Sequence, residues 1–136
     1  MKVAEAAMRL GLTVKAGRRG LDREVLAGYT ADLLSDVMAR APRGALWVTL
    51  QTHENVVAVA LLIEAAGVVI TGGREPEEAA CRRAESENIP LLTTPETTFA
   101  ISGKLYALLG EKECLCAGSG PTCTSIPLCP LAQKRK

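Results

Sequence analysis

The chain has 136 residues, which is enough for one compact domain and too few for two. Hydrophobic residues make up 48% of it but aromatic residues only 3%, so its core has to be built from Ala, Val, Leu and Ile. The formal net charge of +1 argues against a surface for nucleic acid or for acidic membranes. Neither a signal peptide nor a long uncharged apolar run is visible, so we expect a cytoplasmic protein.

The first half of the chain alternates short helical and extended patterns. Apolar residues at helical spacing, with Gly11 and Pro42 as stop signals, predict the first two helices. A third segment is apolar on every side, but it is too long and too rich in Ala for a strand. We therefore expect helices over residues 2–10, 32–40 and 54–65. We expect strands around residues 12–16, 24–28 and 45–50.

The second half continues the alternation up to residue 109. We expect strands over residues 68–71 and 89–93, a helix over 76–88 that begins at Pro76, and a last helix from Thr94–Pro95 to about 109. From residue 45 onward, strand and helix alternate at least three times. Such alternation implies right-handed crossovers and a mostly parallel sheet with helices on both faces. The predicted fold class is therefore α/β, a three-layer sandwich.

The composition changes at residue 110 to Cys, Gly, Pro and Ser, so we divide the chain into a domain (1–109) and a Cys-rich tail (110–136). Four tail cysteines have the spacing C-x-C-x6-C-x5-C: Cys114, Cys116, Cys123 and Cys129. Four thiolates can hold zinc or an iron–sulfur cluster, although this spacing is neither a usual ferredoxin run nor a paired C-x-x-C. Redox-labile thiols or a disordered tail remain the alternatives. Cys81, among alanines in a helical pattern, is best explained as a small core residue.

Several stretches resemble one known family. They are Leu21–Val25, Gly28–Met38, Leu46–Ala60 and Thr71–Gly73. These residues resemble the DRTGG domain, a small α/β module found alone, beside CBS domains in some pyrophosphatases, and upstream of phosphotransacetylases. The resemblance spans residues 1–109 and does not extend to the tail. The first two stretches also look like the N-terminal domain of HPr kinase/phosphorylase, but the chain has no GxxxxGK[ST] loop and cannot be the kinase half.

The resemblance implies a regulatory or accessory binding module without catalytic activity of its own. Similar stand-alone members occur beside iron hydrogenase and other redox-complex components in anaerobic bacteria, which implies a redox-enzyme partner. We also expect a homodimer. One alternative is an iron–sulfur electron-transfer accessory protein that uses the four-Cys tail, and another is a small-molecule enzyme.

Ligands of parallel α/β sheets bind beyond the carboxyl ends of the strands, where three polar loops are predicted to meet. They are Gln51–Thr52–His53, Thr71–Gly72–Gly73–Arg74 and Thr93–Thr94. Backbone N–H groups at the glycines and the guanidinium of Arg74 would suit a small anionic ligand or a nucleotide. The neighbouring acidic residues Glu75, Glu77 and Glu78 would repel an anion. The alternative is a turn that only needs glycine for its positive φ.

His53 is the only histidine and precedes a predicted helix, so it could donate to a ligand or act as a capping residue. No nucleophile and base accompany it in the sequence, so we assign no catalytic residue. Asp32, Ser35 and Asp36 resemble the polar patch of the family and are candidate ligand contacts. Asp32 and Ser35 could equally serve the start of the following helix.

Overall fold

A computed structural model describes the fold of residues 1–112. The helices are α1 (Val3–Leu10), α2 (Leu34–Arg40), α3 (Asn55–Leu62), α4 (Glu78–Glu87) and α5 (Thr98–Lys112), with one 3-10 turn, η1 (Arg18–Gly20). The strands are β1 (Thr13–Ala16), β2 (Ala27–Thr30), β3 (Ala45–Thr49), β4 (Gly67–Ile70) and β5 (Leu91–Thr93). Within residues 1–112, no helix is both long and apolar enough to span a lipid bilayer.

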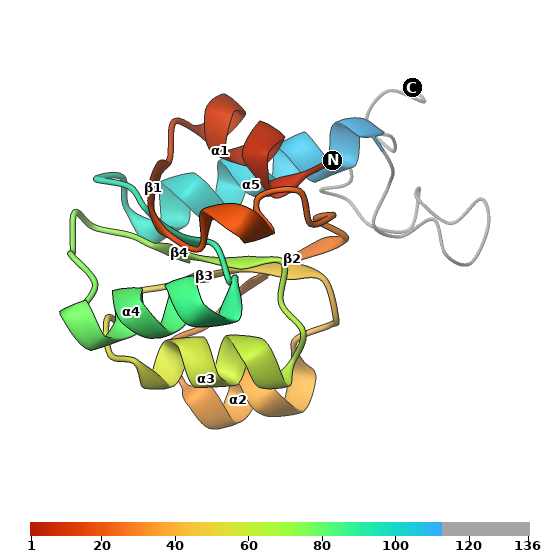
Figure 1. The fold of residues 1–136 in the computed structure, drawn as a ribbon. Helices are drawn as coiled ribbons and strands as arrows, with labels where there is room; N and C mark the ends of the chain where they lie inside the picture. Colours follow the sequence, from red (N-terminus) through yellow and green to blue (C-terminus); the bar gives the residue numbers. More distant parts are fainter. Residues whose placement is uncertain (113–136) are drawn as a thin grey trace, which may run out of the picture.

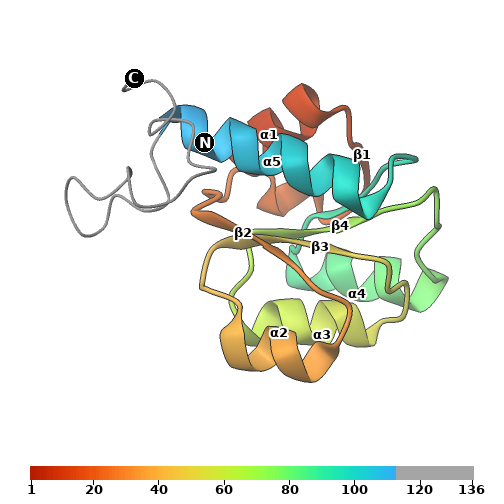
Figure 2. The ribbon, with the colours of Figure 1, turned by 180° about the vertical axis from the view of Figure 1, so that it is seen from behind.

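The strands form one five-stranded sheet in the order β1-β5-β4-β3-β2. β2, β3, β4 and β5 run parallel, and β1 joins β5 in the antiparallel direction. Helices α1 and α5 cover one face of the sheet, and α2, α3 and α4 cover the other (Figures 1 and 2). The expected three-layer α/β sandwich with a mostly parallel sheet is confirmed.

The core is divided by the sheet into two apolar clusters, and β3 contributes to both. Leu46 and Val48 pack toward α1 and α5, whereas Trp47 packs toward α2 and α3. Successive side chains of a strand point to opposite faces, so a strand covered on both sides has to be apolar throughout. Trp47 is fully buried, and its indole N–H donates to the carbonyl of Ala31 at 2.8 Å, which satisfies its polar atom.

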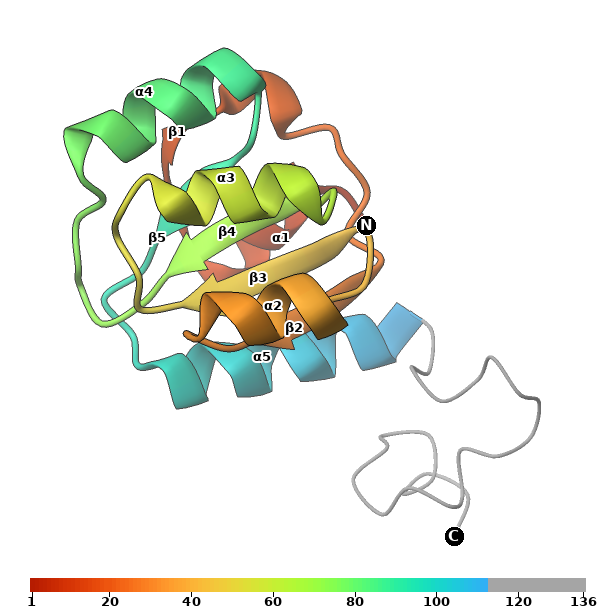
Figure 3. The same ribbon diagram turned by 90° about the horizontal axis from the view of Figure 1, so that it is seen from below.

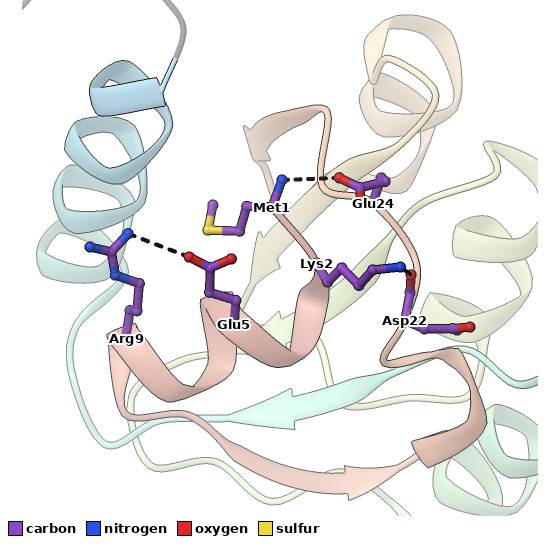
Figure 4. A network of polar contacts seen from close by, with 6 residues as sticks. All are labelled: Met1, Lys2, Glu5, Arg9, Asp22 and Glu24. Carbon is purple, nitrogen blue, oxygen red and sulfur yellow. Dashed lines mark hydrogen bonds and ion pairs between the residues drawn. The ribbon is translucent and has the colours of Figure 1, made fainter.

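The strand expected over residues 24–28 begins three residues later and spans Ala27–Thr30. Residues 24 and 25 pair instead with the start of the chain: Glu24 bridges to Lys2, and the N–H of Val25 donates to the carbonyl of Met1. Figure 4 shows the polar contacts of this corner, where the terminal amine lies 3.0 Å from Glu24 and Lys2 donates to the carbonyl of Asp22. The same view shows the Arg9–Glu5 ion pair along α1, at 3.7 Å.

Four helices differ from the sequence prediction by two or more residues at an end. α3 ends at Leu62 rather than at residue 65, because the backbone of Glu64 takes a positive φ of 56°. α2 begins at Leu34 rather than at residue 32, because the Asp32 side chain is bonded to β3. α4 begins at Glu78 rather than at Pro76, because the backbone of Glu77 is still extended and its N–H donates to Thr52. α5 begins at Thr98 and continues to Lys112, past the expected end near residue 109. The four tail cysteines lie outside the described residues.

Candidate functional site

The carboxyl ends of β2, β3, β4 and β5 share one edge of the sheet, as parallel strands require. The loops that follow these strands carry most of the residues predicted as ligand contacts. Two clusters of hydrogen bonds connect the loops to one another. Gln51 and Asp32 belong to the first cluster, and Thr71, Gly72, Gly73 and Thr94 belong to the second.

In the first cluster, Asp32 joins the end of β2 to the end of β3. One of its carboxylate oxygens accepts the hydroxyl of Thr49 at 2.9 Å and the N–H of Leu50 at 2.8 Å. The side-chain amide of Gln51 donates back to the carbonyl of Asp32 at 3.1 Å. Thr49 is fully buried, so its hydroxyl depends on protein partners. Thr49 is not predicted as a site residue from the sequence, because its local pattern is that of a buried apolar strand.

In the second cluster, the loops after β4 and β5 are joined to the start of α5. The buried hydroxyl of Thr71 lies 2.6 Å from that of Thr98. The hydroxyl of Thr94 accepts the N–H of Glu96 at 3.2 Å, and Glu96 in turn accepts the ammonium of Lys104 at 2.6 Å. Thr93, the last residue of β5, is buried. Thr98 and Glu96 escaped prediction because nothing in their local pattern shows that α5 returns to this edge.

The two glycines after β4 form a turn. Gly72 and Gly73 have φ of +74° and +71°, a region that side chains with a Cβ rarely adopt. Their N–H groups donate to the carbonyls of Glu96 and Thr94, at 2.8 and 3.0 Å. These two donors are therefore engaged within the protein. The turn leaves Arg74 exposed, and no ion pair or hydrogen bond of its guanidinium occurs among residues 1–112.

The acidic residues next to Arg74 are arranged differently from what their sequence positions suggested. Glu75 pairs with Lys15 of β1 at 3.1 Å. The N–H of Glu77 donates to the carbonyl of Thr52 at 3.0 Å, which brings the loop of Arg74 beside the loop of Gln51 and Thr52. The helix itself starts only at Glu78, so Arg74 lies in a loop and not at a helix N-terminus.

The remaining candidates lie outside both hydrogen-bond clusters. Ser35 is exposed on α2, whose N-cap Leu33 provides no side-chain cap. Asp36, also on α2, accepts the hydroxyl of Tyr29 at 2.6 Å, and this hydrogen bond raises the pKa of Tyr29. His53 is exposed, and its Nδ1 accepts the N–H of Asn55 at 3.1 Å, as a residue at the start of a helix does.

No metal site is formed by the part of the chain that the structure describes: residues 1–112 contain no group of three or more His, Cys, Asp or Glu side chains that could hold an ion. Cys81 is half-buried on α4, and burial, followed by the charge of Glu75, raises the pKa of its thiol. Its thiolate is therefore less available at neutral pH than that of an exposed cysteine.

A hollow of about 360 Å³ lies next to this edge, between β2 and α5. Its lining consists of Gly28, Thr30, Phe99, Ser102, Gly103, Leu105, Tyr106 and Leu109. The hydroxyls of Thr30 and Ser102 lie 2.8 Å apart at one end, and the ring of Phe99 is 91% exposed beside it. The sequence pattern predicts that Ile101, Leu105 and Leu108 form the buried face of α5, and it makes no prediction for the opposite face. The recurrence of Phe99, Gly103 and Tyr106 at helical spacing was the signal that could have revealed it.

Comparison with known proteins agrees with this architecture. Among curated proteins, none matches the chain. The crystal structure of the CBS and DRTGG domains of the regulatory region of Clostridium perfringens pyrophosphatase, complexed with the activator diadenosine tetraphosphate, is similar with a TM-score of 0.60 and 15% identity. The similarity covers 75% of this chain and 44% of that one, so the present chain spans less than half of the pyrophosphatase region. The sequence model of the DRTGG domain matches residues 9–108, and the chain belongs to the DRTGG domain family.

Proposed function

We propose that this chain is a regulatory or accessory module that binds a nucleotide, through its phosphate groups, at the carboxyl edge of the sheet. The observation that carries the proposal is the exposed guanidinium of Arg74, which follows the Gly72–Gly73 turn and has no ion-pair partner within residues 1–112. A guanidinium can bind a phosphate group through two parallel hydrogen bonds. Its neighbour Glu75 is turned toward Lys15 and so competes less for Arg74.

Two further donors lie on the adjoining loop. Gln51 is exposed and Thr52 is half-buried, and the bond from Glu77 to Thr52 holds their loop next to that of Arg74. Hydroxyl and amide groups beside a guanidinium are typical of a site that orients a phosphorylated ligand. Diadenosine tetraphosphate is the activator of the similar pyrophosphatase region, and it supports testing nucleotides first.

The test is a thermal-shift titration of the full chain with adenine nucleotides, pyridine nucleotides and acyl phosphates. A ligand that binds only the folded state raises the melting temperature by mass action. For Arg74→Ala, the ligand concentration that gives the same rise in melting temperature should increase at least about tenfold, because about one charged hydrogen-bonded contact is lost. Arg19→Ala is the matched control. Arg19 is also exposed, but it lies near the opposite end of β5, the amino end, where Gly17 lies against Ile89.

The absence of any shift across the panel would contradict nucleotide binding, and equal effects of the two substitutions would place the ligand elsewhere. Turnover of a compound in the panel would favour the alternative of a small-molecule enzyme.

A second candidate function rests on the tail sequence. Four cysteines between residues 114 and 129 favour a zinc or iron–sulfur site and, with it, an electron-transfer role beside a redox-enzyme partner. Anaerobic purification with metal analysis distinguishes the two metals, because an iron–sulfur cluster absorbs visible light and zinc does not. A coloured protein would favour electron transfer, and a colourless zinc protein would favour a structural tail.

A further inference from the structure

The hollow between β2 and α5 reaches the carboxyl edge of the sheet. α5 lies beside β2, and it starts at the end of the sheet to which the arrowheads of β3 and β4 point (Figure 3). Thr30, the last residue of β2, and Phe99, in the first turn of α5, both line the hollow. Its volume of about 360 Å³ is typical of a small-molecule site. The hollow therefore has the position and the size expected for a ligand of this edge.

Two aromatic rings on one face of α5 line the hollow. Phe99 and Tyr106 are seven residues apart in the helix, which is about two turns. Phe99 is the only phenylalanine of the chain, and its ring is 91% exposed, so the core does not use it. Exposed aromatic faces bind flat heteroaromatic rings by stacking, and the contact tolerates different bases because every base has a π-face. The two rings thus favour a planar ligand.

Gly103 lies between these two aromatic residues, in the interior of α5. A Cβ added there would meet no atom within 4 Å, so the packing of this chain does not require glycine. Glycine is nevertheless less favourable than alanine inside a helix. The missing side chain leaves open space over the helix backbone, where a flat ring can lie beside Phe99.

One end of the hollow is polar. The hydroxyls of Thr30 and Ser102 lie 2.8 Å apart there, and either can be the donor. A hydroxyl donates once and accepts twice, so the bond between them leaves the pair with a donor and with free acceptor positions. Adenine presents an amino donor beside a ring-nitrogen acceptor, and such an edge can use both.

Hydrogen bonds hold the turn that precedes Arg74 against the start of α5. The hydroxyl of Thr71 lies 2.6 Å from that of Thr98, the residue before Phe99. The N–H of Gly72 donates to the carbonyl of Glu96 at 2.8 Å. Three residues of chain span at most about 11 Å, so the Cα of Arg74 lies within that distance of the Cα of Thr71. A ligand that lies along this edge can therefore contact both elements.

We propose that the hollow binds the base of the nucleotide whose phosphate groups bind Arg74. The base lies flat over Gly103 against the ring of Phe99, and its polar edge meets the hydroxyls of Thr30 and Ser102. This inference rests on the proposed function for the phosphate half of the ligand and adds the base half. The ligand class is then a purine nucleoside polyphosphate, and neither inorganic phosphate nor an acyl phosphate fills the site.

The test separates the two halves of the ligand. The full chain is titrated by equilibrium dialysis with adenosine, with inorganic tripolyphosphate and with adenosine triphosphate. Because the chain has a single phenylalanine, the NMR signals of the Phe99 ring report directly on the hollow. We expect adenosine to shift these signals saturably. Adenosine triphosphate should bind more tightly than either half, since one molecule then makes both contacts.

Phe99→Ala should raise the dissociation constant of adenosine at least about tenfold, as the loss of a base–aromatic stack implies, and leave that of tripolyphosphate unchanged. Arg74→Ala should have the opposite pattern. Leu62→Ala is the control, because Leu62 is also an exposed apolar residue but lies on α3, on the other face of the sheet. Gly103→Leu should block adenosine without lowering the melting temperature, because leucine favours the helix and its side chain starts in open space.

The outcomes distinguish this inference from the proposed function. Phe99 signals that ignore adenosine, while tripolyphosphate still binds through Arg74, would overturn the base site and leave the phosphate site standing. Adenosine binding that depends on Phe99, without any binding of tripolyphosphate, would support the base site and overturn the phosphate site. If adenosine triphosphate binds no more tightly than its stronger half, the two halves do not belong to one ligand. Phe99 signals that respond to protein concentration and not to adenosine would assign the hollow to a second copy of the chain and overturn the proposal.

Discussion

The carboxylate of Asp32 accepts the hydroxyl of Thr49 at 2.9 Å, although the two residues are 17 positions apart in the sequence. The same oxygen accepts the N–H of Leu50. Asp32 therefore holds the loop after β2 against the end of β3 at the carboxyl edge of the sheet. The family resemblance suggests Asp32 as a ligand contact, and its hydrogen bonds in the structure show in addition a supporting role in holding the loops.

We predict that Asp32→Ala lowers the free energy of unfolding by about 1–3 kcal/mol, because the buried hydroxyl of Thr49 and the N–H of Leu50 each lose an acceptor. Urea unfolding measures the change. Asp22→Ala is the control, since Asp22 is exposed and is bonded through its backbone carbonyl. Equal unfolding midpoints for the two variants would contradict the supporting role of Asp32.

Two glycines with positive φ should respond very differently to alanine. At Gly72 the added Cβ would lie 3.6 Å from the nearest atom, so only the backbone conformation is penalised, by about 1–2 kcal/mol. At Gly17 the Cβ would lie 1.9 Å from the carbonyl oxygen of Ile89, which is backbone and cannot move aside cheaply. Gly17→Ala should therefore lower the melting temperature much more than Gly72→Ala. Similar losses of melting temperature in the two variants would show that the positive φ alone, and not the steric contact at Gly17, sets the cost of the substitution.

The sequence predicted the layers of the fold because buried parallel strands are apolar throughout. β3 and β4 have only buried residues, and each is followed by a helix, so alternation and composition agree. β2 was misplaced because residues 24–26 look equally extended. What separates them from β2 is pairing with the start of the chain, a long-range contact that local pattern does not contain.

The candidate site was predicted only in part for the same reason. The ends of the strands can be predicted from the sequence. The carboxyl edge does contain three of the predicted residues, Asp32, Thr71 and Thr94. Their partners Thr98 and Thr49 come from other elements, and the tertiary fold alone brings them together. The exposed surface of α5 is not predicted from the sequence, because apolar spacing along a helix identifies the face that the helix buries and not the face that it leaves open.

The Tyr29–Asp36 hydrogen bond predicts a change of stability at alkaline pH. The hydroxyl of Tyr29 donates to Asp36, which raises the pKa of Tyr29 above its ordinary value of 10.0. The folded state thus keeps a proton that the unfolded state has released. The stabilisation is present in full below about pH 10 and is lost as the pH rises through the raised pKa.

Tyr29→Phe and Asp36→Asn should both flatten this alkaline decline, because each removes one half of the pair. Denaturant unfolding at a series of pH values above and below 10 measures the slope. Should both variants lose stability as steeply as the wild type, the decline would come from other groups.

The last prediction is that Cys114, Cys116, Cys123 and Cys129 act as one unit around a single metal ion or cluster. Four thiolates spaced C-x-C-x6-C-x5-C, with glycines and prolines between them, have the number and kind of ligands that a closed tetrahedral site needs. Replacing any one of them by Ser should lower the metal content of anaerobically prepared protein and expose the segment to protease. The effects should be strongly non-additive, because a site that lacks one ligand already lacks most of its affinity.

Cys81→Ser is the control and should keep the metal, since Cys81 lies on α4 and packs against the core. Wild-type protein supplied with iron and zinc that retains less than about a tenth of an equivalent of either would exclude the unit, because a closed four-thiolate site binds far more tightly than that.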